Sequence, residues 1–136
     1  MGFSKPTIVI VEIGSSPSPR WDFKVWCRAV SETGADLIKV QVFQHSHFPM
    51  SEQASKKKVE FPISRFSEFV KTAHHSGLLA GASVFQGKDL AVVVNHTDFL
   101  KLASREELNR GLMEQIKYYN ISKLPVYRSS TTIEEL

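Results

Sequence analysis

Ionisable side chains interrupt three apolar stretches of this sequence at positions that would otherwise be buried. Glu12 lies near the end of the first stretch, Lys39 inside the second and Lys101 inside a later one. Removing a charge from water is costly unless a partner compensates it. One carboxylate and two ammonium groups brought together would form a net-positive pocket, which suits a phosphate or a carboxylate. The alternative is that the glutamate and the lysines pair with each other and have only a structural role.

The elements that must position these charges alternate between strand and helix patterns. The expected strands are 7–13, 37–43, 78–85, 99–104 and 124–130, and helical spacing of apolar residues falls between them. Such alternation predicts a parallel sheet covered by helices. Because side chains alternate faces along a strand, Lys39 and Gln41 share a face, and Lys101 shares one with Phe99. The charged face would then point away from the helices.

Local signals set the expected ends of the helices. Ser18 is a candidate N-cap with Pro19 at the first helical position, and the helix would run through Val25 to its end at Gly34. Residues 44–60 are polar and are expected to form a loop, in which the basic run Lys56–Lys58 faces solvent.

Short strand–helix units with polar residues at the strand ends suit a (β/α)8 barrel, although a doubly wound sheet is an alternative. A whole barrel needs about 250 residues, whereas this chain has 136. Thr132–Glu135 has the pattern of a capping box, after which only Leu136 follows. The expected fold is α/β, an incomplete TIM barrel of about five parallel βα units in one domain, 1–136. An open sheet would expose an edge and one face, so we expect a homo-oligomer, most simply a homodimer.

Composition excludes several classes of protein. The net charge of +3 is spread along the chain, so no basic face for nucleic acid is visible. A lone cysteine, Cys27, rules out an internal disulfide and any cysteine-based zinc site. No signal peptide or membrane span is expected, and the predicted location is cytoplasmic. His45 and His47 have no acidic residue nearby in the sequence, so no metal site is predicted from them.

Five segments, taken together, resemble a known family. Their order and spacing are similar to those of the N-acetylneuraminate (sialic acid) synthase family; the segments are Val11–Gly14, Gly34–Phe43, Ala82–Phe85, Asp98–Glu106 with Asn109, and Pro125–Leu136. The resemblance implies the barrel part of those enzymes, without their C-terminal antifreeze-like domain. It also implies their reaction, in which phosphoenolpyruvate condenses with an N-acetylated amino sugar with the help of a divalent metal, Mn or Mg.

The resemblance assigns roles to residues of this chain. Those that would contact phosphoenolpyruvate are Lys39, Ser83, Lys101 and Ser104, with Gln41 beside Lys39 in the same pocket. Glu12 and Glu106 would face the sugar and its reacting centre as catalytic residues. Asn109 matches an asparagine of the family's fourth loop and is also assigned to substrate binding.

Departures from the family pattern bear on activity. The family's asparagine- and histidine-containing stretch after the first strand is here Ser15–Pro19, and its aspartate after the third strand is here Gln86. Arg105 and Arg128 replace a small and an apolar residue. The metal-binding histidines of the family lie on later strands, so no metal ligand is predicted in this chain.

Three functions therefore stay open. The chain is a synthase acting on phosphoenolpyruvate and an amino sugar, or a non-catalytic remnant that binds an anionic sugar or phosphate. The third alternative is a Schiff-base aldolase using Lys39 or Lys101. The altered loops, the missing strands and the missing metal ligands favour the remnant over full activity.

Overall fold

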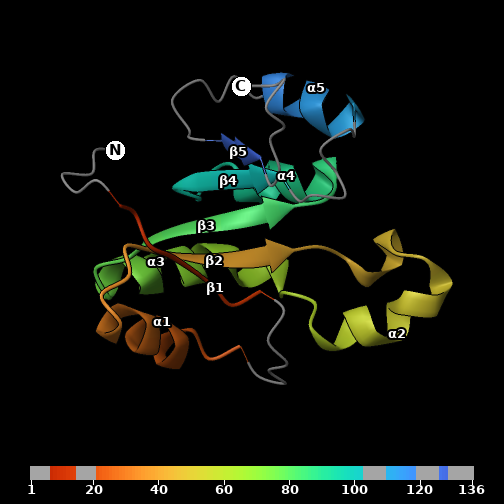
Figure 1. The fold of residues 1–136 in the computed structure, drawn as a ribbon. Helices are drawn as coiled ribbons and strands as arrows, with labels where there is room; N and C mark the ends of the chain where they lie inside the picture. Colours follow the sequence, from red (N-terminus) through yellow and green to blue (C-terminus); the bar gives the residue numbers. More distant parts are fainter. Residues whose placement is uncertain (1–6, 15–20, 103–109, 119–125, 129–136) are drawn as a thin grey trace.

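The computed structural model describes residues 7–14, 21–102, 110–118 and 126–128, and its strands form one parallel sheet (Figure 1). The five strands follow the chain in the order β1-β2-β3-β4-β5. Their bounds are β1 Ile10–Glu12, β2 Leu37–Val42, β3 Leu79–Val84, β4 Phe99–Leu102 and β5 Val126–Arg128. The helices are α1 Phe23–Glu32, α2 Met50–Lys58, α3 Phe66–His75, α4 Gly87–Val93 and α5 Arg110–Tyr118, with 3-10 turns η1 His45–His47 and η2 Ile63–Arg65.

The strand order decides between the two predicted architectures. Each strand pairs in parallel with the next strand of the chain. A doubly wound sheet reverses its order at a switch point, whereas a barrel does not. The structure therefore confirms the predicted α/β fold as an incomplete (β/α)8 barrel of five parallel strands.

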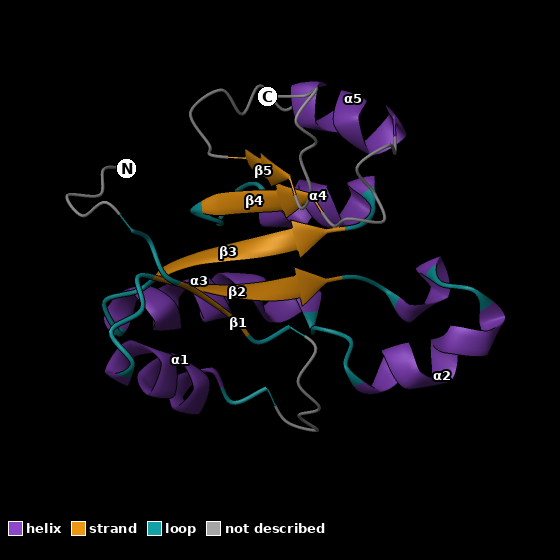
Figure 2. Cartoon of the chain, in the orientation of Figure 1, coloured by secondary structure: helices purple, strands orange, loops and turns teal. Residues whose placement is uncertain are grey.

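One face of the sheet packs against helices and forms the main core. Figure 2 shows α3 and α4 behind the strands. The strand residues of this core are Ile38, Val40, Val42, Ala80, Ala82, Val84, Leu100 and Leu102, and all are buried. They alternate with the residues of the opposite face, as a strand's period of two requires. Among the described helices, none is long and apolar enough to cross a membrane.

An aromatic cluster joins α1 and α3. Phe61, which belongs to no helix or strand, lies 5.1 Å from Trp21, 5.7 Å from Phe23 and 5.7 Å from Phe69 between ring centroids. Phe66 completes the set at 5.9 Å from Phe61. Edge-to-face and stacked aromatic pairs add to the stability that burial provides. A connecting residue thus stands at the centre of this part of the core.

The first helix begins later than predicted. Asp22 is its N-cap, and its Oδ1 accepts a hydrogen bond of 3.2 Å from the backbone N–H of Val25. The predicted cap, Ser18, lies outside the described residues. Val25, expected on the buried face, is 63% exposed, whereas Phe23 and Cys27 are buried. Gly34 follows the helix with φ of 81°, which confirms the predicted end, because glycine reaches this left-handed conformation without strain.

The prediction of a loop over residues 44–60 was wrong. This stretch contains η1 and α2, which lie beyond the C-terminal ends of β2 and β3 in Figure 1. The lysine run Lys56–Lys58 forms the last turn of α2, where cations are favoured by the helix dipole. The ammonium of Lys56 also lies 4.6 Å from the centre of the Phe48 ring. The helix is polar, so it has little apolar periodicity by which it could be recognised in the sequence.

Candidate functional site

The face of the sheet that points away from the main core carries the charged residues. A cavity of about 400 Å³ lies on this face, and we call it the lysine cavity. Its lining residues are Ile10, Glu12, Lys39, Gln41, Phe99 and Lys101. The alternation predicted for β2 and β4 is thus what the structure shows.

Lys39 is the most deeply buried charge of the lysine cavity. It is 5% exposed, and its Nζ donates a hydrogen bond of 2.6 Å to Oγ of Ser83 on the next strand. The same ammonium forms an ion pair with the carboxylate of Glu12 on β1. Three strands therefore meet at one ammonium group.

Burial lowers the pKa of Lys39 below its usual value of 10.5. The carboxylate of Glu12 acts in the opposite direction, and the positive charge of Lys101 adds to the lowering. Desolvation disfavours the charged form of a lysine, and here it outweighs the ion pair because the side chain of Glu12 is 37% exposed. The ammonium is thus less stable in this position than it would be in water.

The end of β1 is shaped to bring Glu12 to β2. The backbone N–H of Gly14 donates a hydrogen bond of 2.6 Å to Oε1 of Glu12. A Cβ atom at position 14 would collide with the backbone nitrogen of Gln41 and with that carboxylate. Glycine is therefore needed for the close approach of the two strands, which accounts for the glycine in the Val11–Gly14 segment.

Lys101 lies two strands away from Lys39 on the same face. It is half-buried, and in the parallel register it is the partner of Ser83, which in turn is the partner of Gln41. The register therefore places an amide, a hydroxyl and an ammonium side by side across β2, β3 and β4. Groups of this kind bind the oxygens of phosphates and carboxylates through charge-assisted hydrogen bonds.

Five of the eight predicted site residues meet on this face, and the other three lie outside the residues that the structure describes. Glu12, Lys39, Gln41, Ser83 and Lys101 are the five that the structure brings together. Ser104, Glu106 and Asn109 lie outside the described residues, as do Arg105 and the side chain of Arg128. The functional roles that the resemblance assigns to all eight stay predictions.

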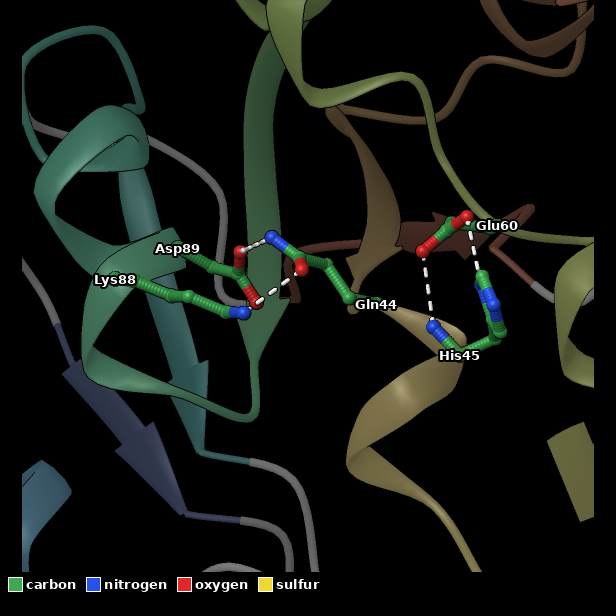
Figure 3. Close-up of polar contacts among 5 residues, drawn as sticks. All are labelled: Gln44, His45, Glu60, Lys88 and Asp89. Atoms are coloured by element: carbon green, nitrogen blue, oxygen red, sulfur yellow. Dashed lines mark hydrogen bonds and ion pairs between the residues drawn. The ribbon is translucent and has the colours of Figure 1, made fainter. Parts of the chain in front are cut away.

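A second polar cluster joins the loops that follow β2 and β3 (Figure 3). Gln44 Nε2 donates to Oδ1 of Asp89 at 3.3 Å, and Lys88 Nζ donates to Oε1 of Gln44 at 2.8 Å. Asp89 is 1% exposed, and burial raises its pKa above 3.8 although Gln44 and Lys88 act to lower it. Sequence reasoning missed this cluster because its members are some 45 residues apart.

His45 has an acidic partner that the sequence did not suggest. Its Nδ1 lies 3.2 Å from Oε2 of Glu60, and its backbone N–H donates to Oε1 of the same residue at 2.9 Å (Figure 3). His47 Nδ1 instead lies 2.7 Å from Nε2 of Gln86. Over the described part of the chain, three or more histidine, cysteine or acidic side chains nowhere gather as a metal site would require. These residues therefore join loops at the rim of the sheet.

A larger hollow, of about 580 Å³, lies outside the sheet near the starts of α1 and α3. Two of its charged residues, Arg65 and Glu68, form an ion pair of 2.9 Å whose side chains are 41% and 55% exposed. Exposed pairs of this kind contribute little to binding or stability. The smaller lysine cavity is the better candidate site, because its charges converge on one face of the sheet and one of them, Lys39, is buried.

Among known protein families, curated proteins and solved structures, only solved structures match this chain. No family model matches the sequence, and no curated protein does. The N-acetylneuraminic acid (sialic acid) synthetase from Leptospira borgpetersenii has a TM-score of 0.80 at 21% identity, over 96% of this chain and 47% of that one. The chain has the fold of that synthetase. The resemblance seen in the sequence is thereby confirmed at the level of the fold.

Two other solved structures share the fold. Spore coat polysaccharide biosynthesis protein E from Chromobacterium violaceum has a TM-score of 0.73 at 19% identity, over 89% of this chain and 40% of that one. A truncated 3-deoxy-D-arabino-heptulosonate 7-phosphate synthase from Thermotoga maritima has a TM-score of 0.65 at 18% identity, over 94% and 43%. This chain spans less than half the length of each of the three proteins.

Proposed function

We propose that this chain binds phosphoenolpyruvate in the lysine cavity, as part of a synthase that condenses it with an N-acetylated amino sugar. The observation that carries the proposal is the placement of Lys39, Ser83 and Lys101 on one face of the sheet of a synthetase-like fold. Sites of parallel barrels lie at the C-terminal ends of the strands, where loops bring further residues to them.

The chemistry of the cavity matches the two anionic groups of phosphoenolpyruvate. Lys39 and Lys101 would hold its phosphate and carboxylate, and Ser83 would supply a hydroxyl donor once Lys39 turns toward the ligand. Glu12 would keep Lys39 charged in the absence of the ligand. A divalent metal would act in such a reaction as a Lewis acid. The described residues offer no donor set for it, so no step is assigned to a metal here.

Titration calorimetry with phosphoenolpyruvate tests the proposal. We expect saturable binding, and we expect Lys101→Met to weaken it on the order of tenfold or more, because a charge-assisted hydrogen bond is lost. Lys71→Met is the matched control, since Lys71 is exposed on α3, which packs against the other face of the sheet. Absence of heat at millimolar phosphoenolpyruvate, or equal loss in both variants, would contradict the proposal.

A condensation assay separates the synthase from the remnant. Release of phosphate from phosphoenolpyruvate in the presence of an N-acetylated amino sugar would indicate turnover. Binding without release would support a non-catalytic protein that retains the anion site. The predicted association with a second copy stays a prediction.

The burial of Lys39 favours a second candidate, a Schiff-base lysine. Its ammonium would pass a proton to Glu12, and the free amine would add to a ketone to form a carbinolamine. Loss of water, with the proton returned by Glu12, would leave an iminium on Nζ. A buried lysine beside a second cation is suited to this chemistry, and Lys39 fits it better than the half-buried Lys101.

Trapping with borohydride tests the second candidate. We expect pyruvate and borohydride to add one reduced adduct, which mass spectrometry would locate on Lys39. The adduct should disappear in Lys39→Met and persist in Lys101→Met. A wild-type protein that remains unmodified would eliminate the Schiff-base mechanism and leave anion binding untouched.

A further inference from the structure

On the β3 and β4 side, the floor of the lysine cavity is an aromatic ring that lies on a glycine. Phe99 projects from β4 on the cavity face and is 1% exposed. A Cβ atom at Gly81 on β3 would collide with three atoms of this ring, Cε1, Cζ and Cδ1. The ring therefore lies directly over the backbone of β3, in space that any other residue at position 81 would occupy.

The register of the strands gives the depth of this ring. Lys39, Gly81 and Phe99 are partners in one row across the sheet. The next row toward the C-terminal ends holds Gln41, Ser83 and Lys101 as partners. The ammonium of Lys39 reaches toward this upper row, where it donates to Ser83. The polar groups thus converge in the row nearer the C-terminal ends of the strands. The ring of Phe99 lies in the row nearer their N-terminal ends.

A ligand that enters from the C-terminal ends of the strands meets the ammonium groups before it meets the ring. Because the ring is closely packed on Gly81, it fills the space over β3 that lies beneath Ser83 and Lys101. We propose that Phe99, supported by Gly81, is the depth stop of the lysine cavity and restricts its ligand to a small anion. This inference rests on the proposed function, since it takes anion binding in the cavity as given.

Substituted phosphonates measure the depth of the cavity. Methylphosphonate and phenylphosphonate carry the same anionic group, and only the second carries a benzene ring. In the wild-type protein we expect phenylphosphonate to bind more weakly than methylphosphonate. In Phe99→Ala the order should reverse, with phenylphosphonate tighter by roughly tenfold or more, the typical effect of an apolar group entering a matching pocket. Phe99→Ala removes a benzene ring from this space, and engineered cavities of that kind can accept benzene.

A smaller substitution keeps the test valid if Phe99→Ala does not fold. Phe99→Leu leaves a smaller gap, and its matching probe is ethylphosphonate, which should gain relative to methylphosphonate. Phe69→Leu is the matched control, because Phe69 is a fully buried phenylalanine in the core on the opposite face. Its ranking of the phosphonates should equal that of the wild-type protein.

The outcomes separate the depth stop from the binding site itself. An unchanged ranking in both Phe99 variants would overturn the depth stop while leaving anion binding intact. The same change of ranking in Phe69→Leu would also overturn it, because the effect would then come from general loosening. If no phosphonate and no phosphoenolpyruvate binds the wild-type protein, the proposed function fails and the depth stop fails with it.

Discussion

Lys39→Met is expected to reduce the affinity for phosphoenolpyruvate on the order of a hundredfold and to leave the protein at least as stable as before. The loss of affinity follows from removing the most buried of the positive charges, whose hydrogen bonds to an anion are of the strong, charge-assisted kind. Affinity and stability are expected to change in opposite directions, because a buried charge that is placed to bind a ligand lowers the stability of the protein while the ligand is absent.

The stability of this variant follows from the burial of the ammonium. Replacing a buried charge with an apolar side chain of similar size is often neutral or stabilising, so we expect a gain between zero and about 2 kcal/mol. Glu12 keeps contact with water through its 37% exposed side chain and with the N–H of Gly14. Glu12→Gln is the contrasting variant, since it leaves the ammonium buried without a carboxylate. It should cost about 1–3 kcal/mol, less than a fully buried pair because Glu12 is partly solvated.

The pH dependence of stability provides an independent check on Lys39. Its pKa is lowered in the folded protein, while the unfolded chain keeps the usual value of 10.5. Between the two values the unfolded state binds more protons, so the free energy of unfolding should rise as the pH rises through that interval. Below the pKa that Lys39 has in the folded protein, its unfavourable contribution to the free energy of unfolding does not change with pH. Lys39→Met should lack this rise.

Urea denaturation at several pH values, from neutral to alkaline, measures both effects, and calorimetry measures the affinity. A Lys39→Met protein that unfolds more easily than the parent at neutral pH would show that the Glu12–Lys39 pair stabilises the sheet. Retained affinity for phosphoenolpyruvate would place the anion elsewhere.

Phe61→Ala is expected to lower the free energy of unfolding by about 3–5 kcal/mol, which is the usual cost of deleting a buried phenylalanine ring. Phe61 is 2% exposed, and its ring contacts those of Trp21, Phe23, Phe66 and Phe69. Since domains are stable by roughly 5–15 kcal/mol in total, this single change should bring the protein close to unfolding.

Phe61→Leu separates the loss of volume from the loss of ring contacts. It fills most of the space and should cost about 1–2 kcal/mol less than the alanine variant. Urea midpoints for the two variants, with circular dichroism to confirm folding, give the comparison. A cost below about 1 kcal/mol for alanine would indicate that this connecting segment is not packed as described.

The sequence was sufficient to predict the strand–helix alternation and the face of the charged residues. Both depend on local periodicity: Lys39 and Gln41 alternate with Ile38, Val40 and Val42, and a strand's period of two then separates the two sets. Gly34 predicted a helix end for an equally local reason, since its positive φ suits glycine. The start of α1 was predicted too early, because Ser18 and Asp22 are both good caps and only packing selects between them.

Only the tertiary structure decided which groups meet. The contact of Lys39 with Ser83 joins residues 44 positions apart, and that of Gln44 with Asp89 joins residues 45 apart. No local pattern encodes the register between strands that makes such contacts, because register depends on the packing of whole strands and helices. The charges on the strands were therefore visible in the sequence, whereas the burial of Lys39 and the seating of Phe99 on Gly81 followed from the way neighbouring strands pair.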